Sequence, residues 1–172
     1  MKFQLIGDET TIEIDVLYRN YPNSSDYWDG NWVTSKINIK IPGYLVNFDA
    51  NLRTDELRDF ANEIKLMSKL LKGKATLNNL DNYLHIECEM DKLGKIIWTA
   101  ETCYPAGDGA VLKFEFESDQ SFLIGLMKEL ETILKPPRHS HESENQDPQS
   151  LRGLAGTRES PEKPLLGRAK SL

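Results

Sequence analysis

The spacing of apolar residues changes near residue 54, and this change restricts the folds that are open to the chain. Before it, apolar and polar residues alternate, as they do in strands with one buried face. From Leu57 to Leu71 the spacing becomes three and four residues, which is typical of a helix with one apolar stripe. Thr54 is the expected N-cap of this helix, and Gly73 is its expected C-terminal stop.

Alternation returns after Gly73, and a second apolar stripe predicts a helix over residues 122–134. Eight segments have strand spacing: Phe3–Ile6, Thr11–Tyr18, Trp32–Ile41, Tyr44–Leu52, Lys74–Leu77, Tyr83–Met90, Lys95–Thr102 and Val111–Glu117. Strands joined by short turns pair antiparallel, so we expect an α+β fold that is mainly antiparallel sheet. The order, four strands and a helix repeated once, suggests two similar halves, although no residue-level repeat accompanies it.

The composition changes at residue 136. Residues 1–135 are predicted to form a single domain, which is long enough to bury a core of ordinary size. Residues 136–172 are polar and rich in Gly, Pro, Arg and Ser. Such a segment buries too little apolar surface to offset the entropy of ordering it, so we predict a disordered C-terminal tail.

The charge of the predicted domain bears on its partners. The whole chain has a net charge of -6, and residues 1–135 hold 22 acidic and 15 basic residues. An acidic surface repels phosphates, which argues against direct binding of DNA or RNA. The same charge would suit a basic protein partner, but simple solubility also explains it.

The sequence predicts a cytoplasmic protein. No apolar run approaches the roughly 18 residues of a membrane span. Residues 1–8 lack the apolar stretch of a secretory signal. In a reducing compartment, Cys88 and Cys103 are expected to be free thiols.

The segment from Asp26 to Trp32, directly ahead of the third predicted strand, is the strongest candidate for recognition. Tryptophan combines a large apolar area with an N–H donor, which suits a binding surface. The predicted binding residues here are Asp26, Tyr27, Trp28, Asp29, Asn31 and Trp32. The alternative is that one or both tryptophans close the end of the core while the acids cap the turn. The spacing of the oxygen ligands does not match a calcium loop.

Arg53 is the seventh predicted binding residue. A bidentate pair between Arg53 and Asp26 or Asp29 would hold the segment in place. The alternative is plain capping of the helix that follows.

The other residue that could carry chemistry, His85, is expected to have a structural role. His85 shares a strand face with Glu87, whereas Cys88 points to the other face, so a His–Cys dyad is badly placed. The sequence contains no metal-ligand cluster, phosphate loop or nucleophile beside a base. We therefore expect no metal, no cofactor and no enzymatic activity.

The stretch from Tyr27 to Trp32, opening a strand of alternating apolar residues, resembles a segment of small bacterial proteins. They carry D-Y-W-D-A/G-N-W near the N-terminus and are known as WapI-type immunity proteins. The order of elements is also similar over residues 1–135. The resemblance implies a cytoplasmic protein that neutralises the C-terminal nuclease domain of a toxin by stoichiometric binding. Nuclease domains are often basic, and charge complementarity would speed the encounter.

Three functional hypotheses follow. The first is a non-enzymatic protein-binding module, specifically an immunity protein. The second is a small-ligand or sugar-binding domain that uses Tyr27 and Trp28 as stacking surfaces. The third is a hydrolase, which requires a deep cleft with two acids about 5–10 Å apart.

Overall fold

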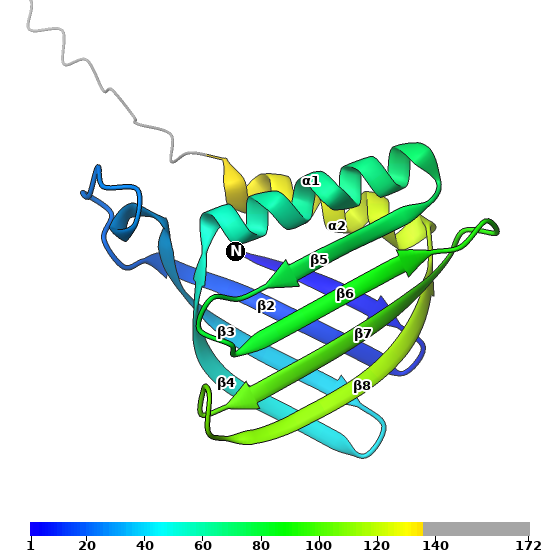
Figure 1. Cartoon of the computed structure of the whole chain (residues 1–172), viewed down its shortest axis with the longest axis horizontal. Helices are drawn as coiled ribbons and strands as arrows, with labels where there is room; N and C mark the ends of the chain where they lie inside the picture. Colours follow the sequence, from blue (N-terminus) through cyan, green and yellow to red (C-terminus); the bar gives the residue numbers. More distant parts are fainter. Residues whose placement is uncertain (136–172) are drawn as a thin grey trace, which may run out of the picture. The chain divides into compact units, whose positions relative to one another are not determined.

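The strands and helices follow one another in the order that the sequence predicts (Figure 1). The computed structural model describes residues 1–135. Its elements are β1 (Lys2–Gly7), β2 (Thr10–Arg19), β3 (Trp32–Ile41), β4 (Tyr44–Arg53), α1 (Thr54–Leu70), β5 (Gly73–Asn78), β6 (Leu84–Met90), β7 (Lys95–Tyr104), β8 (Ala110–Asp119) and α2 (Ser121–Leu134), with a short 3-10 turn at Asp29–Asn31. The predicted disordered tail, 136–172, lies outside the described residues, so its disorder and the domain boundary stay predictions.

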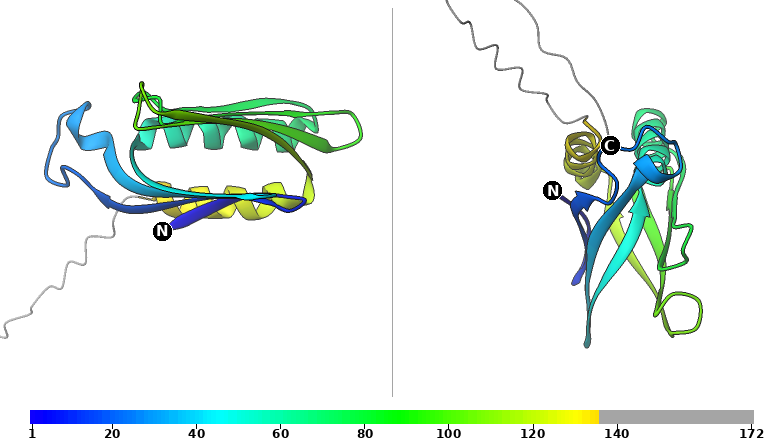
Figure 2. Two further views of the ribbon diagram at one scale, coloured as in Figure 1. Left: turned by 90° about the horizontal axis from the view of Figure 1, so that it is seen from below. Right: turned by 90° about the vertical axis from the view of Figure 1, so that its left-hand side faces the viewer.

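The strands form two antiparallel sheets, with the orders β1-β2-β3-β4 and β5-β6-β7-β8. Each sheet is a meander followed by one helix, so the two halves share one element order. The α+β class and the antiparallel pairing are thereby confirmed. Figure 2 shows the sheets as two layers, with α1 and α2 side by side along one side of them.

One continuous core lies between the sheets and under the helices. Its largest fully buried side chains come from both sheets and from α1, and include Phe3, Ile12, Ile37, Leu52, Phe60, Ile64 and Leu77. Most outward positions of β2 and β7 are polar, as their alternation predicts, with Leu17 and Ile97 among the exceptions. Neither helix covers the outer face of a sheet, because α1 lies along β5 and α2 along β1.

Each helix closes the free edge of the first strand of a sheet. The Gln4 main-chain N–H of β1 donates to Glu129 Oε2 of α2 over 3.0 Å. In the other half, the Thr76 N–H of β5 donates to Glu63 Oε2 of α1 over 2.7 Å. A sheet edge exposes main-chain donors and acceptors, and these carboxylates satisfy some of them.

The ends of the last strands are covered by turns from the opposite sheet. The Asn79 side-chain amide, after β5, donates to the Asn51 carbonyl of β4 over 3.0 Å. The β1–β2 turn lies against β8 at Gly7, where an added Cβ would come within 2.4 Å of the Glu117 carbonyl oxygen. Only glycine permits this approach of the two main chains.

Both predicted ends of the first helix are wrong by one or two residues. Arg53, not Thr54, is the N-cap, because Arg53 is still extended and pairs with Trp32 in the β3–β4 ladder. Glu56 Oε2 accepts its main-chain N–H over 3.0 Å. At the other end Leu71 is the left-handed C-cap, with φ of 52°, ahead of Gly73.

Candidate functional site

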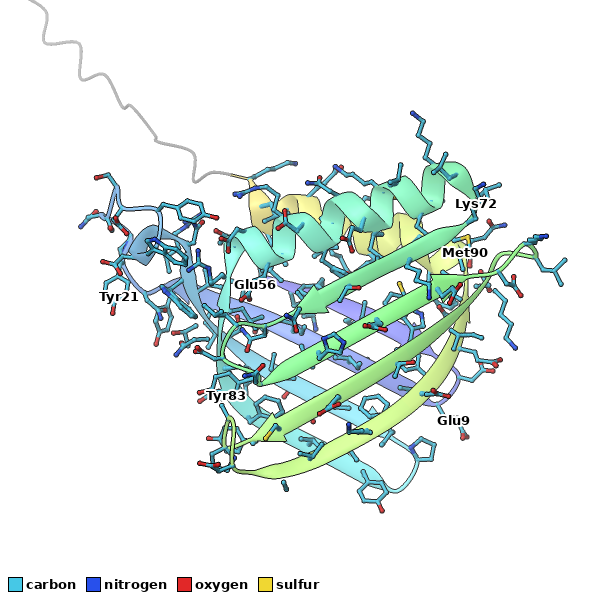
Figure 3. All side chains as sticks on the ribbon, in the orientation of Figure 1. Glu9, Tyr21, Glu56, Lys72, Tyr83 and Met90 are labelled. Carbon is cyan, nitrogen blue, oxygen red and sulfur yellow. The ribbon has the colours of Figure 1, made fainter. Side chains whose placement is uncertain are left out.

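The β2–β3 connection, residues 20–31, projects past the sheet beside the first turn of α1 and is here named the aromatic loop. Figure 3 places Tyr21 in this projecting loop and Glu56 on the first turn of α1. All the predicted binding residues except Trp32 and Arg53 belong to the loop. Those two residues begin β3 and end β4, where they are paired across the ladder.

Asp26 organises the interior of the aromatic loop. Its Oδ1 accepts the main-chain N–H groups of Trp28 over 2.7 Å and of Asp29 over 3.1 Å. The Gly30 N–H donates to the Asp26 carbonyl over 2.9 Å. This is an aspartate turn cap, which fixes the backbone with a short side chain.

The Arg53 guanidinium lies beneath the aromatic rings. Its central carbon is 4.7 Å from the Trp28 ring centroid, 5.5 Å from that of Tyr27 and 5.4 Å from that of Trp32. These are cation–π distances. Arg53 Nη1 is buried and has no hydrogen-bond acceptor within residues 1–135. The electron-rich ring faces around it offset part of that deficit.

Asp55 holds the other side of the Arg53 guanidinium. Arg53 Nε donates to Asp55 Oδ1 over 3.0 Å and Nη2 donates to Oδ2 over 2.7 Å, which is a bidentate pair. The Tyr27 hydroxyl donates to the same Oδ2 over 2.7 Å. The hydrogen bonds from Arg53 lower the pKa of the Asp55 carboxyl from 3.8 to about 2. The bond to Asp55 raises the pKa of Tyr27 above its usual value.

Asn31 ties the loop to α1. The Asn31 amide donates to the Tyr27 carbonyl over 2.7 Å, and the Thr54 hydroxyl donates to Asn31 Oδ1 over 2.5 Å. Glu56, on the same helical turn, accepts from the Leu80 N–H and the Asn79 amide. Burial raises the pKa of the Glu56 carboxyl. The first turn of α1 therefore joins the aromatic loop to the β5–β6 turn.

The resulting surface presents aromatic rings on a buried cation. Arg53 is only 3% exposed, whereas Tyr27 is 60% and Trp28 63% exposed. The two exposed rings pack edge to face, with centroids 5.7 Å apart. Trp32 is half-buried beside them. The arrangement holds two large side chains in water and limits their freedom.

The structure gives the actual partner of Arg53 and the exposure of Trp28 and Asp29. The predicted pair between Arg53 and Asp26 or Asp29 is wrong. The guanidinium pairs with Asp55, two residues further along the chain, and Asp26 instead accepts main-chain N–H groups of the loop. Trp28 does not close the core, although Asp26 does cap the turn. Asp29 is exposed.

The model of the immunity protein WapI-like family matches residues 4–137. The chain belongs to the WapI-like immunity protein family. No curated protein matches the chain closely enough to count as a relative. The resemblance inferred from the stretch between Tyr27 and Trp32 is thereby confirmed.

In this WapI-like protein, His85 and the two cysteines do not form a reactive site. His85 Nδ1 lies 3.0 Å from Asn78 Oδ1 and Nε2 lies 3.1 Å from Glu87 Oε1. Cys88 and Cys103 are free. Burial raises the pKa of the Cys88 thiol to about 12, so this thiol stays protonated and unreactive. Within residues 1–135 no group of three or more His, Cys, Asp or Glu could hold a metal ion, and no helix is long and apolar enough to cross a membrane.

The hydrolase hypothesis finds little support in the carboxylates of the second sheet. Glu87 and Glu89 line a hollow on its outer face. Their side chains are 60% and 63% exposed and are ion-paired with His85 and Lys74. A two-carboxylate hydrolase needs its acids in a deep cleft, and these two side chains stand largely in solvent instead.

Sequence reasoning missed three parts of the site. Asp55 is not among the predicted partners of Arg53, although its place two residues after Arg53 permits a bidentate pair. Tyr18 near the end of β2 and Tyr21 within the loop add exposed aromatic rings, 62% and 54% exposed. A β-bulge between Val16 and Tyr18 breaks the alternation there. Two consecutive apolar residues at a strand end are the signal that could have found it.

Proposed function

We propose that this chain is a non-enzymatic immunity protein that neutralises the toxic C-terminal domain of a toxin by binding it in a one-to-one complex. Tyr27 and Trp28 are its recognition anchors. The proposal rests on one observation, the exposed pair of aromatic rings held over the buried Arg53. Family membership supplies the class of protein and the geometry supplies the candidate surface.

The physical support comes from how binding energy is distributed in interfaces. Tryptophan and tyrosine dominate interface hot spots, because each buries a large area with few rotatable bonds. The cation–π contact of Trp28 with Arg53 and the hydrogen bond from Tyr27 to Asp55 restrict the rotamers of the two rings before binding. A preorganised surface loses less entropy on association, which favours affinity.

The charge of the domain gives the proposal its partner class. Residues 1–135 have an excess of acidic side chains, and a basic nuclease domain in the same cytoplasm would be attracted to them. Inhibition then occurs by occlusion of the toxin, without chemistry. The edge-to-face packing of Tyr27 on Trp28 favours a protein partner over the sugar-binding alternative, because a sugar platform needs an open ring face.

The test begins with affinity capture of the tagged full chain from its own cells, followed by mass spectrometry. We expect one stoichiometric partner with a basic C-terminal domain. Trp28→Ala should then weaken binding of that domain by about thirtyfold or more, while the variant still folds and unfolds cooperatively.

Leu93→Ala is the matched control, because Leu93 is 91% exposed on the β6–β7 turn of the other sheet. It should leave the affinity unchanged. A Trp28→Ala protein that folds and binds normally would refute the assignment of the anchor.

A further inference from the structure

The last strand of the first sheet has an open stretch at its free edge. Helices cover the edges of β1 and β5, and Asn79 covers the end of β4 at Asn51. From Tyr44 to Asp49 no element within residues 1–135 pairs with the outer edge of β4. Tyr83, labelled in Figure 3, lies above the middle of this strand and stacks on Phe48.

The main-chain groups that face outward here can be identified. The Asn51 carbonyl accepts from Asn79, and the Arg53 N–H donates to Glu56, so both residues direct main-chain groups away from β3. In an antiparallel pair, residues facing the partner alternate with residues facing away. The N–H and C=O groups of Leu45, Asn47 and Asp49 therefore point outward too, and no hydrogen bond within the described chain reaches them.

The open part of β4 lacks the features that keep edge strands apart. The last strand of the second sheet, β8, carries the exposed charged residues Lys113 and Glu115. Asp49 is the one charged residue of the open stretch; Tyr44 to Phe48 hold no charge and no proline, and the β3–β4 register runs without a bulge. Leu45 is 75% and Tyr44 is 62% exposed. Edges that stay monomeric are normally charged, bulged or covered.

We infer that β4 pairs with β4 of a second copy of this chain, antiparallel and with the twofold axis at Asn47. This register joins all the outward main-chain groups of Leu45, Asn47 and Asp49 to those of the copy. It also places Val46 opposite Phe48 of the second copy and Asn47 opposite its own equivalent. An antiparallel pair of identical strands is automatically twofold symmetric, so one interface closes the dimer.

Local charge selects a second copy over a basic partner. Lys36 pairs with Asp49 across the β3–β4 ladder, and Lys40 pairs with Leu45, so β3 places two lysines beside this edge. A basic protein would be repelled by them. In the proposed register Leu45 of one copy lies opposite Asp49 of the other, so Lys40 of each copy comes next to an acid of its partner. The dimer leaves the aromatic loop free and does not depend on the toxin-binding proposal.

The test is sedimentation velocity of the full chain over a wide concentration range. The expected result is a reversible dimer at twice the 19.6 kDa mass of the chain. Asn47→Pro removes an outward N–H that β3 does not use and should abolish the dimer. Asn47→Asp sets two like charges opposite each other and should weaken it about tenfold.

Asn62→Asp is the matched control, since Asn62 is exposed on α1, and it should dimerise as the unaltered chain does. Far-UV circular dichroism of each variant verifies folding, and Asn47→Asp keeps the test valid where the proline variant does not fold. A chain that is monomeric at every concentration, or a dimer that Asn47→Asp and Asn47→Pro leave intact, overturns the inference. So does a monomer in which Asn47→Asp weakens binding of a captured toxin domain, because the partner of β4 is then the toxin.

Discussion

The β2–β3 and β6–β7 connections hold the same position in the two halves of the fold, but they are built differently. Four residues, Asp91–Gly94, are enough to join β6 to β7, whereas twelve, residues 20–31, join β2 to β3. Asp91 Oδ1 closes the short turn by accepting the N–H groups of Leu93 and Lys95. The long loop also needs a buried arginine, supplied by β4, to hold its aromatic rings.

This difference separates the connection that the fold requires from the extra residues that this chain adds to it. Both connections join antiparallel strands in a four-stranded meander, so the extra length of the first has no architectural cause. Long connections that are held rigidly are usually functional. The contrast therefore supports the aromatic loop as the recognition surface, and it predicts different responses to mutation in the two connections.

The largest effect is expected when the anchor of the long loop is removed. Arg53→Ala should lower the free energy of unfolding by about 3 kcal/mol, because it leaves the Asp55 carboxylate unpaired in a partly buried site. Denaturant unfolding measures this. Lys65→Ala is the control, since the Lys65–Glu131 pair is half-exposed, and it should cost less than about 1 kcal/mol. Equal losses would mean that Arg53 does not anchor the loop.

A smaller, pH-dependent effect is expected at Asp55. Its pKa is lowered from 3.8 to about 2 in the folded chain, so the ionised carboxylate stabilises the fold above pH 3.8. That contribution, about 2 kcal/mol, is lost as the pH falls through about 2. Asp55→Asn should therefore be less stable than the unaltered chain at neutral pH, and the difference should shrink in acid. Burial raises the pKa of Glu56, which acts in the opposite sense in both proteins.

The smallest change in the free energy of unfolding is expected when the capping aspartates, Asp91 and Asp26, are replaced. Asp91→Ala should lower the free energy of unfolding by about 1 kcal/mol, because the short turn closes a hairpin directly. Asp26→Ala should lower it by less than about 0.5 kcal/mol, since the long loop can open without unfolding the sheet. Hydrogen exchange should instead show lost protection at the Trp28 and Asp29 amides. Equal global losses would contradict this difference between the connections.

The element order could be predicted because hydrophobic spacing alone decides it. Alternation and the turn residues between the segments marked the strands, and the stripe from Leu57 to Leu71 marked α1. The helix ends could not be placed as well, because they depend on contacts distant in sequence. Arg53 is held extended by Trp32, and the Thr54 hydroxyl bonds Asn31 instead of capping α1.

The residues that cluster in the candidate site were predicted more fully than the hydrogen bonds between them. The aromatic segment and Arg53 were recognised as belonging together, because large aromatics, acids and arginine form few kinds of cluster. Which acid pairs with Arg53 depends on the direction in which β4 meets α1, and spacing does not encode it. The open edge of β4 was missed for a similar reason, since edges follow from topology.

One measurement tests the central claim most directly. Residues 21–31 are replaced by the sequence of the β6–β7 turn, Asp-Lys-Leu-Gly, and the affinity of the folded variant for the captured toxin domain is measured by calorimetry. The account predicts a protein that unfolds cooperatively and does not bind. Binding with unchanged affinity would show that recognition lies elsewhere, and failure to fold would show that the loop belongs to the framework.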